Sequence, residues 1–326
     1  MENKGINNFY KYNLKFVILL IIIAINYKFY NSYMKFYTNG KYIKICVCSP
    51  GKQENKYIQE FVTHYKYYGV DKIYLYDNNN IDGEHFEEVI NDFIKSGFVD
   101  IINFRGKTRA LFTMMNHCYK NNFRKYNWLI FFELDEFIHL KNNNLKTYLN
   151  SKNFSKCEAI NLNWCFITDN NLIYYENKTL KERFPITEKK TRKFKSVKTI
   201  LKGGIPNIII NSAHILNKKL KNCNGFGRPS NLNGTGTFDV DFNNYYIDHY
   251  SCKSTEEFVN KLNKGDALYV NENIFDRIKF YFSLNKITKE KIDYIYNHLQ
   301  IFNKTGIGND IINKLNYYFR FSLKYS

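Results

Sequence analysis

Residues 128–137 read Trp-Leu-Ile-Phe-Phe-Glu-Leu-Asp-Glu-Phe, and this stretch decides the fold class. It begins with five apolar residues, 128–132, and continues into three carboxylates at Glu133, Asp135 and Glu136. A short apolar run of this kind is typical of a strand buried on both faces, as in a parallel sheet. Carboxylates that follow such a strand lie where open α/β sheets bind ligands, beyond the carboxyl ends of the strands. The stretch therefore predicts an α/β fold with a ligand site near residue 135.

The same carboxylates indicate what kind of ligand to expect. Clustered carboxylates repel one another unless a cation joins them. Hard divalent ions such as Mg²⁺ take oxygen ligands and are often shared between one or two carboxylates and substrate phosphates. The local pattern is therefore that of a metal–diphosphate site. A strand followed by an ordinary acidic turn has the same sequence, so this stretch alone leaves both interpretations open.

Strand-like and helix-like segments alternate before this stretch. The expected strands cover residues 43–48, 72–76, 98–104 and 128–132, and the expected helices cover 56–68, 83–96 and 108–123. This order predicts a parallel, doubly wound sheet with right-handed crossovers. Asp77 closes the second strand, so its side chain is expected on the same sheet edge as Asp135 and can accept hydrogen bonds from a nucleotide's base or ribose. An Asx turn with the asparagines that follow Asp77 is the alternative.

The second half of the chain is less regular. Strand-like runs cover 159–164 and 245–250, a helix is expected at 255–262, and amphipathic helices are expected after residue 276. The Gly- and Asn-rich segment 222–237 is expected to be a long mobile loop. These patterns predict an N-terminal segment at 1–40, a main domain at 41–270 and a helical extension at 271–326.

Net charge indicates the class of partner, and the cysteines indicate whether zinc motifs or disulfides are expected. The formal charge is +18, and a basic stretch lies at 178–202, so anionic partners are favoured. We expect no nucleic acid, because no nucleic-acid-binding fold accompanies the charge. The seven cysteines form no paired zinc motif, and Cys46 and Cys48 alternate along the first strand as core residues. The odd count predicts no disulfide framework and leaves the redox compartment open.

The N-terminal segment carries ten apolar residues at 16–25, followed by an aromatic-rich flank at 27–33. A spanning helix needs about 20 apolar residues, and aromatic residues gather at membrane interfaces. We expect an uncleaved single-pass membrane anchor, with a terminal hydrophobic helix as the alternative. The expected location is a membrane, Golgi-like in a eukaryote or the cytoplasmic membrane in a bacterium.

Taken in order, the motifs resemble those of glycosyltransferase family 92 and its bacterial and viral relatives, over roughly residues 43–270. The resemblance rests on these pieces: Glu54-Asn55, His64-Tyr65, Gly69-Val70, Tyr76-Asp77-Asn78, Trp128, the acidic stretch 133–137, Trp164, Asp169-Asn170-Asn171, Lys198, His214, and the run His249-Tyr250-x-x-Lys253-Ser254-x-Glu256-Glu257-Phe258 with Lys261 and Gly265. It implies a GT-A fold, which is Rossmann-like with a mostly parallel, doubly wound sheet.

The resemblance also implies an activity and a set of site residues. The activity is inverting transfer of a sugar from a nucleotide-diphosphate donor, a UDP-sugar, to a hydroxyl of a glycan or lipid-linked acceptor, assisted by Mn²⁺ or Mg²⁺. Asp135 matches the last acid of the family's Asp-x-Asp motif and would hold the metal, and His249 would complete the coordination shell of that metal. Glu133 stands where Asp is usual, so it would reach the donor or the metal differently. Asp77 would contact the nucleoside.

Further roles follow from the chemistry of the transfer. Lys198 and Lys253 are candidate cations for the departing diphosphate, with solvated surface lysine as the alternative. Asp169 is the candidate base, with turn capping as the alternative and Glu182 in reserve. Trp164 is a candidate sugar platform or a core residue, and His214 is a candidate support for the metal site. A catalytically degenerate glycan- or anion-binding protein and a nucleotidyl- or phosphotransferase are the competing functions.

Overall fold

The computed structural model describes residues 27, 43–142, 144–185, 195–237, 239–240, 242–264, 274–300 and 307–322. The predicted membrane anchor lies, except for Tyr27, outside the described residues. Among the helices that are described, none combines the length and the apolar character needed to cross a membrane. The fold presented below belongs to the compact unit that begins at Lys44.

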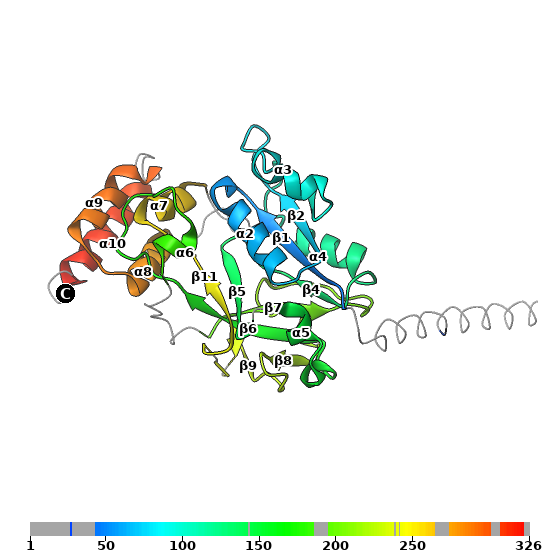
Figure 1. Ribbon diagram of the computed structural model, residues 1–326. Helices are drawn as coiled ribbons and strands as arrows, with labels where there is room; N and C mark the ends of the chain where they lie inside the picture. Colours follow the sequence, from blue (N-terminus) through cyan, green and yellow to red (C-terminus); the bar gives the residue numbers. More distant parts are fainter. Residues whose placement is uncertain are drawn as a thin grey trace, which may run out of the picture. The chain divides into compact units, whose positions relative to one another are not determined.

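A nine-stranded mixed sheet forms the centre of this unit, with the strand order β3-β2-β1-β4-β7-β6-β11-β5 and β8 beside β6 (Figure 1). The strands are β1 Ile45–Gly51, β2 Lys72–Asp77, β3 Val99–Asn103, β4 Trp128–Ile130, β5 Glu136–Leu140, β6 Ala159–Phe166, β7 Val197–Lys202, β8 Asn222–Asn224 and β11 Tyr245–His249. The predicted α/β class is confirmed. The first four strands are parallel, whereas β7 is antiparallel to β4 and β6, and β5 is antiparallel to β11.

Three amphipathic helices connect the parallel strands: α2 Asn55–Tyr67, α3 Glu87–Lys95 and α4 Leu111–Asn122. In α2, the stripe of Ile58, Phe61, Val62 and Tyr65 is buried, as its helical spacing predicts. The helix ends before Gly69, whose φ of +88° is a conformation that glycine adopts at low cost. These helices hold the carboxyl ends of β1, β2 and β4 at one edge of the sheet.

One face of β1 packs against α4, and this packing brings distant cysteines together. Cys46 and Cys48 both lie in the core cluster that contains Met114, Met115 and Cys118 of α4. Cys48 and Cys118 form a disulfide, and a second disulfide joins Cys157 to Cys223. The prediction of no disulfide framework was therefore wrong, because pairing depends on which helix covers which strand. Cys46, Cys165 and Cys252 are buried and take part in neither disulfide.

Helices near the C-terminus share a second core with the sheet. They are α7 Thr255–Lys264, α8 Ile274–Leu284, α9 Lys289–His298 and α10 Ile307–Ser322. Phe258 and Leu262 of α7 pack with Phe166 of β6 and with Ile278 and Tyr281 of α8. Figure 1 shows α8, α9 and α10 gathered beside α7. Because one side of α7 is buried in this core, its opposite side, which carries Lys261, faces Asp135 near the end of β4.

The remaining elements are short. They are α5 Leu145–Leu149, the 3-10 turn Lys152–Phe154, α6 Leu180–Arg183, β9 Leu232–Asn233 and β10 Gly236–Thr237. The segment 222–237, predicted as one long loop, instead contains β8 and the β9–β10 pair. Strands β5 and β7 were not predicted, and both carry residues of the site.

Candidate active site

The register between β5 and β11 assembles the centre of the site. His249, the last residue of β11, pairs with Glu136, the first residue of β5, and the N–H of Tyr250 donates to the Asp135 carbonyl at 2.9 Å. The turn between β4 and β5 is closed by two bonds: the Glu136 N–H donates to the Glu133 carbonyl, and the Glu133 N–H donates to Glu136 Oε2, both at 3.0 Å. Ligand atoms of Asp135, Glu136 and His249 lie within 4.8 Å of one another.

All three residues are buried, with exposed fractions of 5%, 0% and 7% for the whole residue. Burial raises the pKa of Glu136 to about 8, although Lys198 opposes the shift. Burial acts on Asp135 in the same direction, but Lys261 and His249 outweigh it and hold the pKa of Asp135 well below its usual range. Burial lowers the pKa of His249 despite the nearby Asp135, which favours the neutral imidazole that metal coordination requires.

This donor set fits a divalent cation. Ligand atoms on one such ion lie at most about 4–5 Å apart, because each bond is about 2.0–2.6 Å long. Two carboxylates and one imidazole suit Mn²⁺ better than Mg²⁺, which prefers oxygen alone. His249 Nε2 lies 3.7 Å from Asp135 Oδ1, and Nδ1 is buried with no hydrogen-bond partner among the described residues. The ring thus keeps coordinating capacity that the protein itself does not use.

Two lysines partly neutralise this cluster. Lys261 Nζ donates to Asp135 Oδ2 at 2.7 Å. Lys198, which is 2% exposed, forms an ion pair with Glu133 and lies 3.3 Å from Glu136 Oε1. The cluster therefore holds three carboxylates against two ammonium groups, which leaves at most one excess negative charge.

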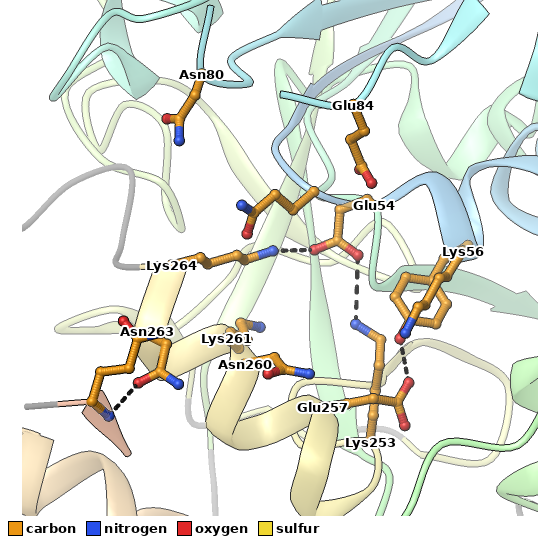
Figure 2. A pocket seen from close by; sticks show the side chains of 13 residues that line it. Glu54, Lys56, Asn80, Glu84, Lys253, Glu257, Asn260, Lys261, Asn263 and Lys264 are labelled. Carbon is orange, nitrogen blue, oxygen red and sulfur yellow. Dashed lines mark hydrogen bonds and ion pairs between the residues drawn. The ribbon is translucent and has the colours of Figure 1, made fainter. Parts of the chain in front are cut away.

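A cleft of about 600 Å³ opens beside the cluster, and Figure 2 shows its walls. One wall comes from the segment after β1 and the start of α2, and the other from α7 and the residues before it. Lys264 Nζ donates to Glu54 Oε1 at 2.8 Å, and Lys253 Nζ lies 3.7 Å from Glu54 Oε2. Lys261 also lines the cleft, so one residue links the cleft to Asp135.

Trp164 adds an aromatic surface next to His249. Its ring centroid lies 4.2 Å from that of His249 and 4.7 Å from that of His214. The indole Nε1 is buried with no hydrogen-bond partner in the part of the chain that is described. His214 Nδ1 lies 3.1 Å from the Val197 carbonyl, and burial lowers its pKa to about 4. Both residues therefore lie next to the predicted metal ligand.

Two predicted residues lie in other contact networks. Asp77 forms an ion pair with Arg105 at 2.6 Å, and its Oδ1 accepts from the Asn79 N–H at 2.9 Å, which is the Asx turn of the alternative interpretation. Asp169 accepts from Tyr281 and Lys291, both at 2.5 Å, and from the Asn171 N–H at 2.9 Å. These contacts favour turn capping and ion pairing over a role as base, which stays a prediction. The reserve candidate Glu182 caps α6 through Thr179.

Comparisons with known proteins identify the family. The model for glycosyltransferase family 92 matches residues 41–306, well over half of the chain. The chain belongs to glycosyltransferase family 92. Two curated family 92 proteins are each 28% identical to it, one from Ricinus communis over 109 residues and one from Oryza sativa subsp. japonica over 106 residues. These alignments cover 33% and 30% of this chain, but only 18% and 17% of the relatives.

Similar chains among solved structures include S. aureus TarS 1–349 in complex with UDP and with UDP-GlcNAc. Both are 11% identical to this chain, with TM-scores of 0.36 and 0.38. The first alignment covers 81% of this chain and 73% of TarS, and the second covers 80% of each. TM-scores this low support no argument about the family 92 chain.

Sequence reasoning assigned no role to three residues that the structure places here: Glu136, Lys261 and Lys264. Glu136 was visible in the acidic stretch but lay one position beyond the matched motif. Lys261 and Lys264 are three residues apart on α7, a spacing that places two side chains on one helical face. That spacing was the available signal, although it does not say what the face contacts.

Proposed function

We propose that this family 92 chain is a metal-dependent, inverting glycosyltransferase of the GT-A fold that uses a nucleotide-diphosphate sugar. The observation that carries the proposal is the juxtaposition of Asp135, Glu136 and His249 at the end of the β5–β11 ladder, beside a lysine-lined cleft. Family membership supports the reaction class, and the cluster supports the metal. A cleft of this volume is within the usual range for small-molecule sites, about 300–1,000 Å³.

Asp135, Glu136 and His249 would hold the ion, which would supply electrophilic stabilisation of phosphate oxygens. The protein's own contribution is a set of lysine cations. Lys253, Lys261 and Lys264 line one cleft, and charge develops on the donor's diphosphate as the glycosidic bond breaks. Preorganised cations in a partly dehydrated site stabilise such charge more strongly in the transition state than in the ground state.

Lys198 serves a different purpose in this proposal. It is almost fully buried between Glu133 and Glu136, so it holds two carboxylates of the acidic turn in place rather than facing the cleft. The replacement of the usual Asp by Glu133 then has a physical reason, because its longer side chain reaches Lys198. Trp164 packs against His249 and is not among the residues that line the cleft, so its role as a sugar platform stays a proposal.

One observation favours a second candidate, a catalytically degenerate anion-binding protein. Asp135 and Glu133 are already paired with lysines, so the acidic turn is satisfied without a metal. Such a protein would bind nucleotide diphosphates through the cleft, with or without Mn²⁺, and would not release sugar from them.

A turnover assay over a panel of nucleotide sugars, with Mn²⁺ or with a chelator, separates the two candidates. We expect turnover only with the metal. We expect Asp135→Asn to lower kcat by about 10²–10³-fold with the fold retained, the usual cost of losing one electrostatic contact in the transition state. NMR of the first-formed product tests the inverting stereochemistry, which predicts the opposite anomeric configuration from the donor.

Asp100→Asn is the matched control. Asp100 forms an ion pair with Lys72 at 2.6 Å on β3, and its side chain is 50% exposed. Because exposed ion pairs contribute only about 0–1 kcal/mol, this variant should keep both stability and turnover. Near-normal turnover of Asp135→Asn, or turnover that the chelator leaves unchanged, would remove the metal-dependent mechanism.

A further inference from the structure

Lys261 contacts both the predicted metal ligand Asp135 and the cleft. Its Nζ donates to Asp135 Oδ2 at 2.7 Å and lies 3.4 Å from the Ser251 carbonyl. The same side chain lines the cleft together with Lys253 and Lys264. Its side chain is 27% exposed, whereas that of Asp135 is 6% exposed, so Lys261 approaches the buried carboxylate from the cleft side.

The contact between Lys261 and Asp135 conflicts with a divalent ion on the same carboxylate. An ammonium group has three donors and no lone pair, so it cannot join the coordination shell. Nζ lies 2.7 Å from one carboxylate oxygen, and an ion bound to either oxygen would lie within a few ångströms of it. Like charges at that separation in a poorly hydrated site repel strongly. The Lys261 ammonium and the ion therefore compete for the negative charge of Asp135.

The cleft offers Lys261 an alternative position. Lys264 lies three residues further along α7 and reaches Glu54 on the opposite wall, and Lys253 approaches the same carboxylate (Figure 2). The carboxylate of Glu257 on this wall is taken up by Arg183 at 2.6 Å, so it does not neutralise the lysines. An anion with several charged oxygens in the cleft would find Lys261, Lys253 and Lys264 on one side.

We propose that Lys261 is the built-in counter-ion of Asp135, that a divalent ion displaces it, and that the released ammonium then binds the donor's diphosphate in the cleft. This inference rests on the function proposed above. In this inference, binding of the metal strengthens binding of the diphosphate, because the displaced Lys261 ammonium becomes available in the cleft. Binding of the diphosphate strengthens binding of the metal, because it draws Lys261 away from Asp135. By linkage, the coupling is the same in both directions.

The test is a titration of the full chain with Mn²⁺ alone, without nucleotide, in which the electron paramagnetic resonance signal of free Mn²⁺ reports binding. In Lys261→Met the competitor is gone, and we expect the dissociation constant for Mn²⁺ to fall by about tenfold or more, within the usual range of coupling between sites. Lys146→Met is the control: it removes an ammonium that pairs with Asp71 at 2.5 Å outside the cleft, and both side chains are about a third exposed, so we expect a change of less than about threefold. Circular dichroism spectra check that the variants are folded.

A second variant covers the case in which Lys261→Met does not fold. Lys261→Arg keeps the charge and adds the planar fork that matches a carboxylate, so its Mn²⁺ affinity should equal that of the natural protein or be weaker. The inference alone is overturned if the natural protein binds Mn²⁺ and Lys261→Met binds it no more tightly, or if Lys261→Arg binds it more tightly. Absence of Mn²⁺ binding in every variant overturns the inference together with the proposed metal dependence.

Discussion

Replacing Asp169 with asparagine distinguishes a structural role from a catalytic one. The Asp169 side chain is 2% exposed and joins the segment after β6 to two C-terminal helices. It accepts from Tyr281 of α8 and from Lys291 of α9, each at 2.5 Å. Asparagine keeps the shape and one acceptor oxygen, but it removes the counter-charge of Lys291, whose side chain is 1% exposed.

The expected loss of stability follows from this burial. Removing one partner of a buried ion pair costs about 3–5 kcal/mol, because the other charge is left uncompensated. For a chain of this size, about 2–4 °C of Tm is lost per kcal/mol, so Asp169→Asn should lower Tm by roughly 6–20 °C. Lys291→Met should cost a similar amount, since it leaves the carboxylate unpaired. The double variant buries no charge and should lose less than the sum, with a coupling free energy of about 2–3 kcal/mol.

Urea unfolding followed by circular dichroism gives the three differences in unfolding free energy, and turnover at a temperature where all variants are folded gives kcat. We expect Asp169→Asn to be less stable and to keep kcat within about tenfold of the natural protein. General-base catalysis contributes about 10²–10⁴-fold, so loss of a base would be plain. An unchanged urea midpoint together with a loss of that size would refute the structural role and restore Asp169 as the base.

Two other predictions concern the scaffold. His64 stacks on Tyr68 and its Nε2 lies 3.1 Å from the Ile138 carbonyl, and burial lowers its pKa from 6.5 to about 3. Between those values the unfolded chain binds the proton and the folded chain does not, so the unfolding free energy should fall as pH falls, by at most about 1.4 kcal/mol per pH unit. His64→Gln, which retains an N–H donor, should flatten the measured slope, and an identical slope in both proteins would contradict this. The Cys48–Cys118 disulfide closes a sequence separation of 70 residues, so the double alanine variant should lose about 4 kcal/mol in urea unfolding, and an unchanged midpoint would show that the bond adds nothing.

The parallel half of the fold could be predicted from the sequence because its signals are local. The stripe on α2 repeats every three to four residues, and the apolar run of β4 stands out against its neighbours. Strand β7 escaped prediction because Lys198 and Lys202 made it resemble part of a basic loop. Both lysines are buried: Lys198 lies between carboxylates, and Lys202 Nζ lies 3.2 Å from the Ser155 carbonyl. No local sequence pattern predicts partners of this kind.

The site shows the same division between local and long-range information. Asp135 and His249 were both predicted, but 114 positions separate them, and only the β5–β11 register places one beside the other. A slip of one residue in that pairing would turn His249 to the opposite face of the sheet. Asp77 and Asp169 have the same kind of local sequence as Asp135, an acidic residue after a strand. What distinguishes them is the cation that reaches each: Arg105 and Lys291 for the first two, and Lys261 for the third.

Backbone conformation supports the assignment of the cleft independently of its charges. Among the described residues, three that are neither asparagine nor glycine have a positive φ. Two of them, Gln53 and Lys253, line the cleft from opposite walls, and each has a φ of 54°. This region costs an ordinary residue about 1–2 kcal/mol, and glycine would avoid the cost. At position 253, however, glycine would also delete the ammonium that approaches Glu54 and lies 4.2 Å from the ring centroid of Tyr57. Such conformations concentrate at binding and catalytic sites, where the surrounding structure enforces them. The fold therefore keeps an unfavourable backbone conformation where β11 leads into α7, and that turn is what aims Lys253 into the cleft alongside Lys261 and Lys264.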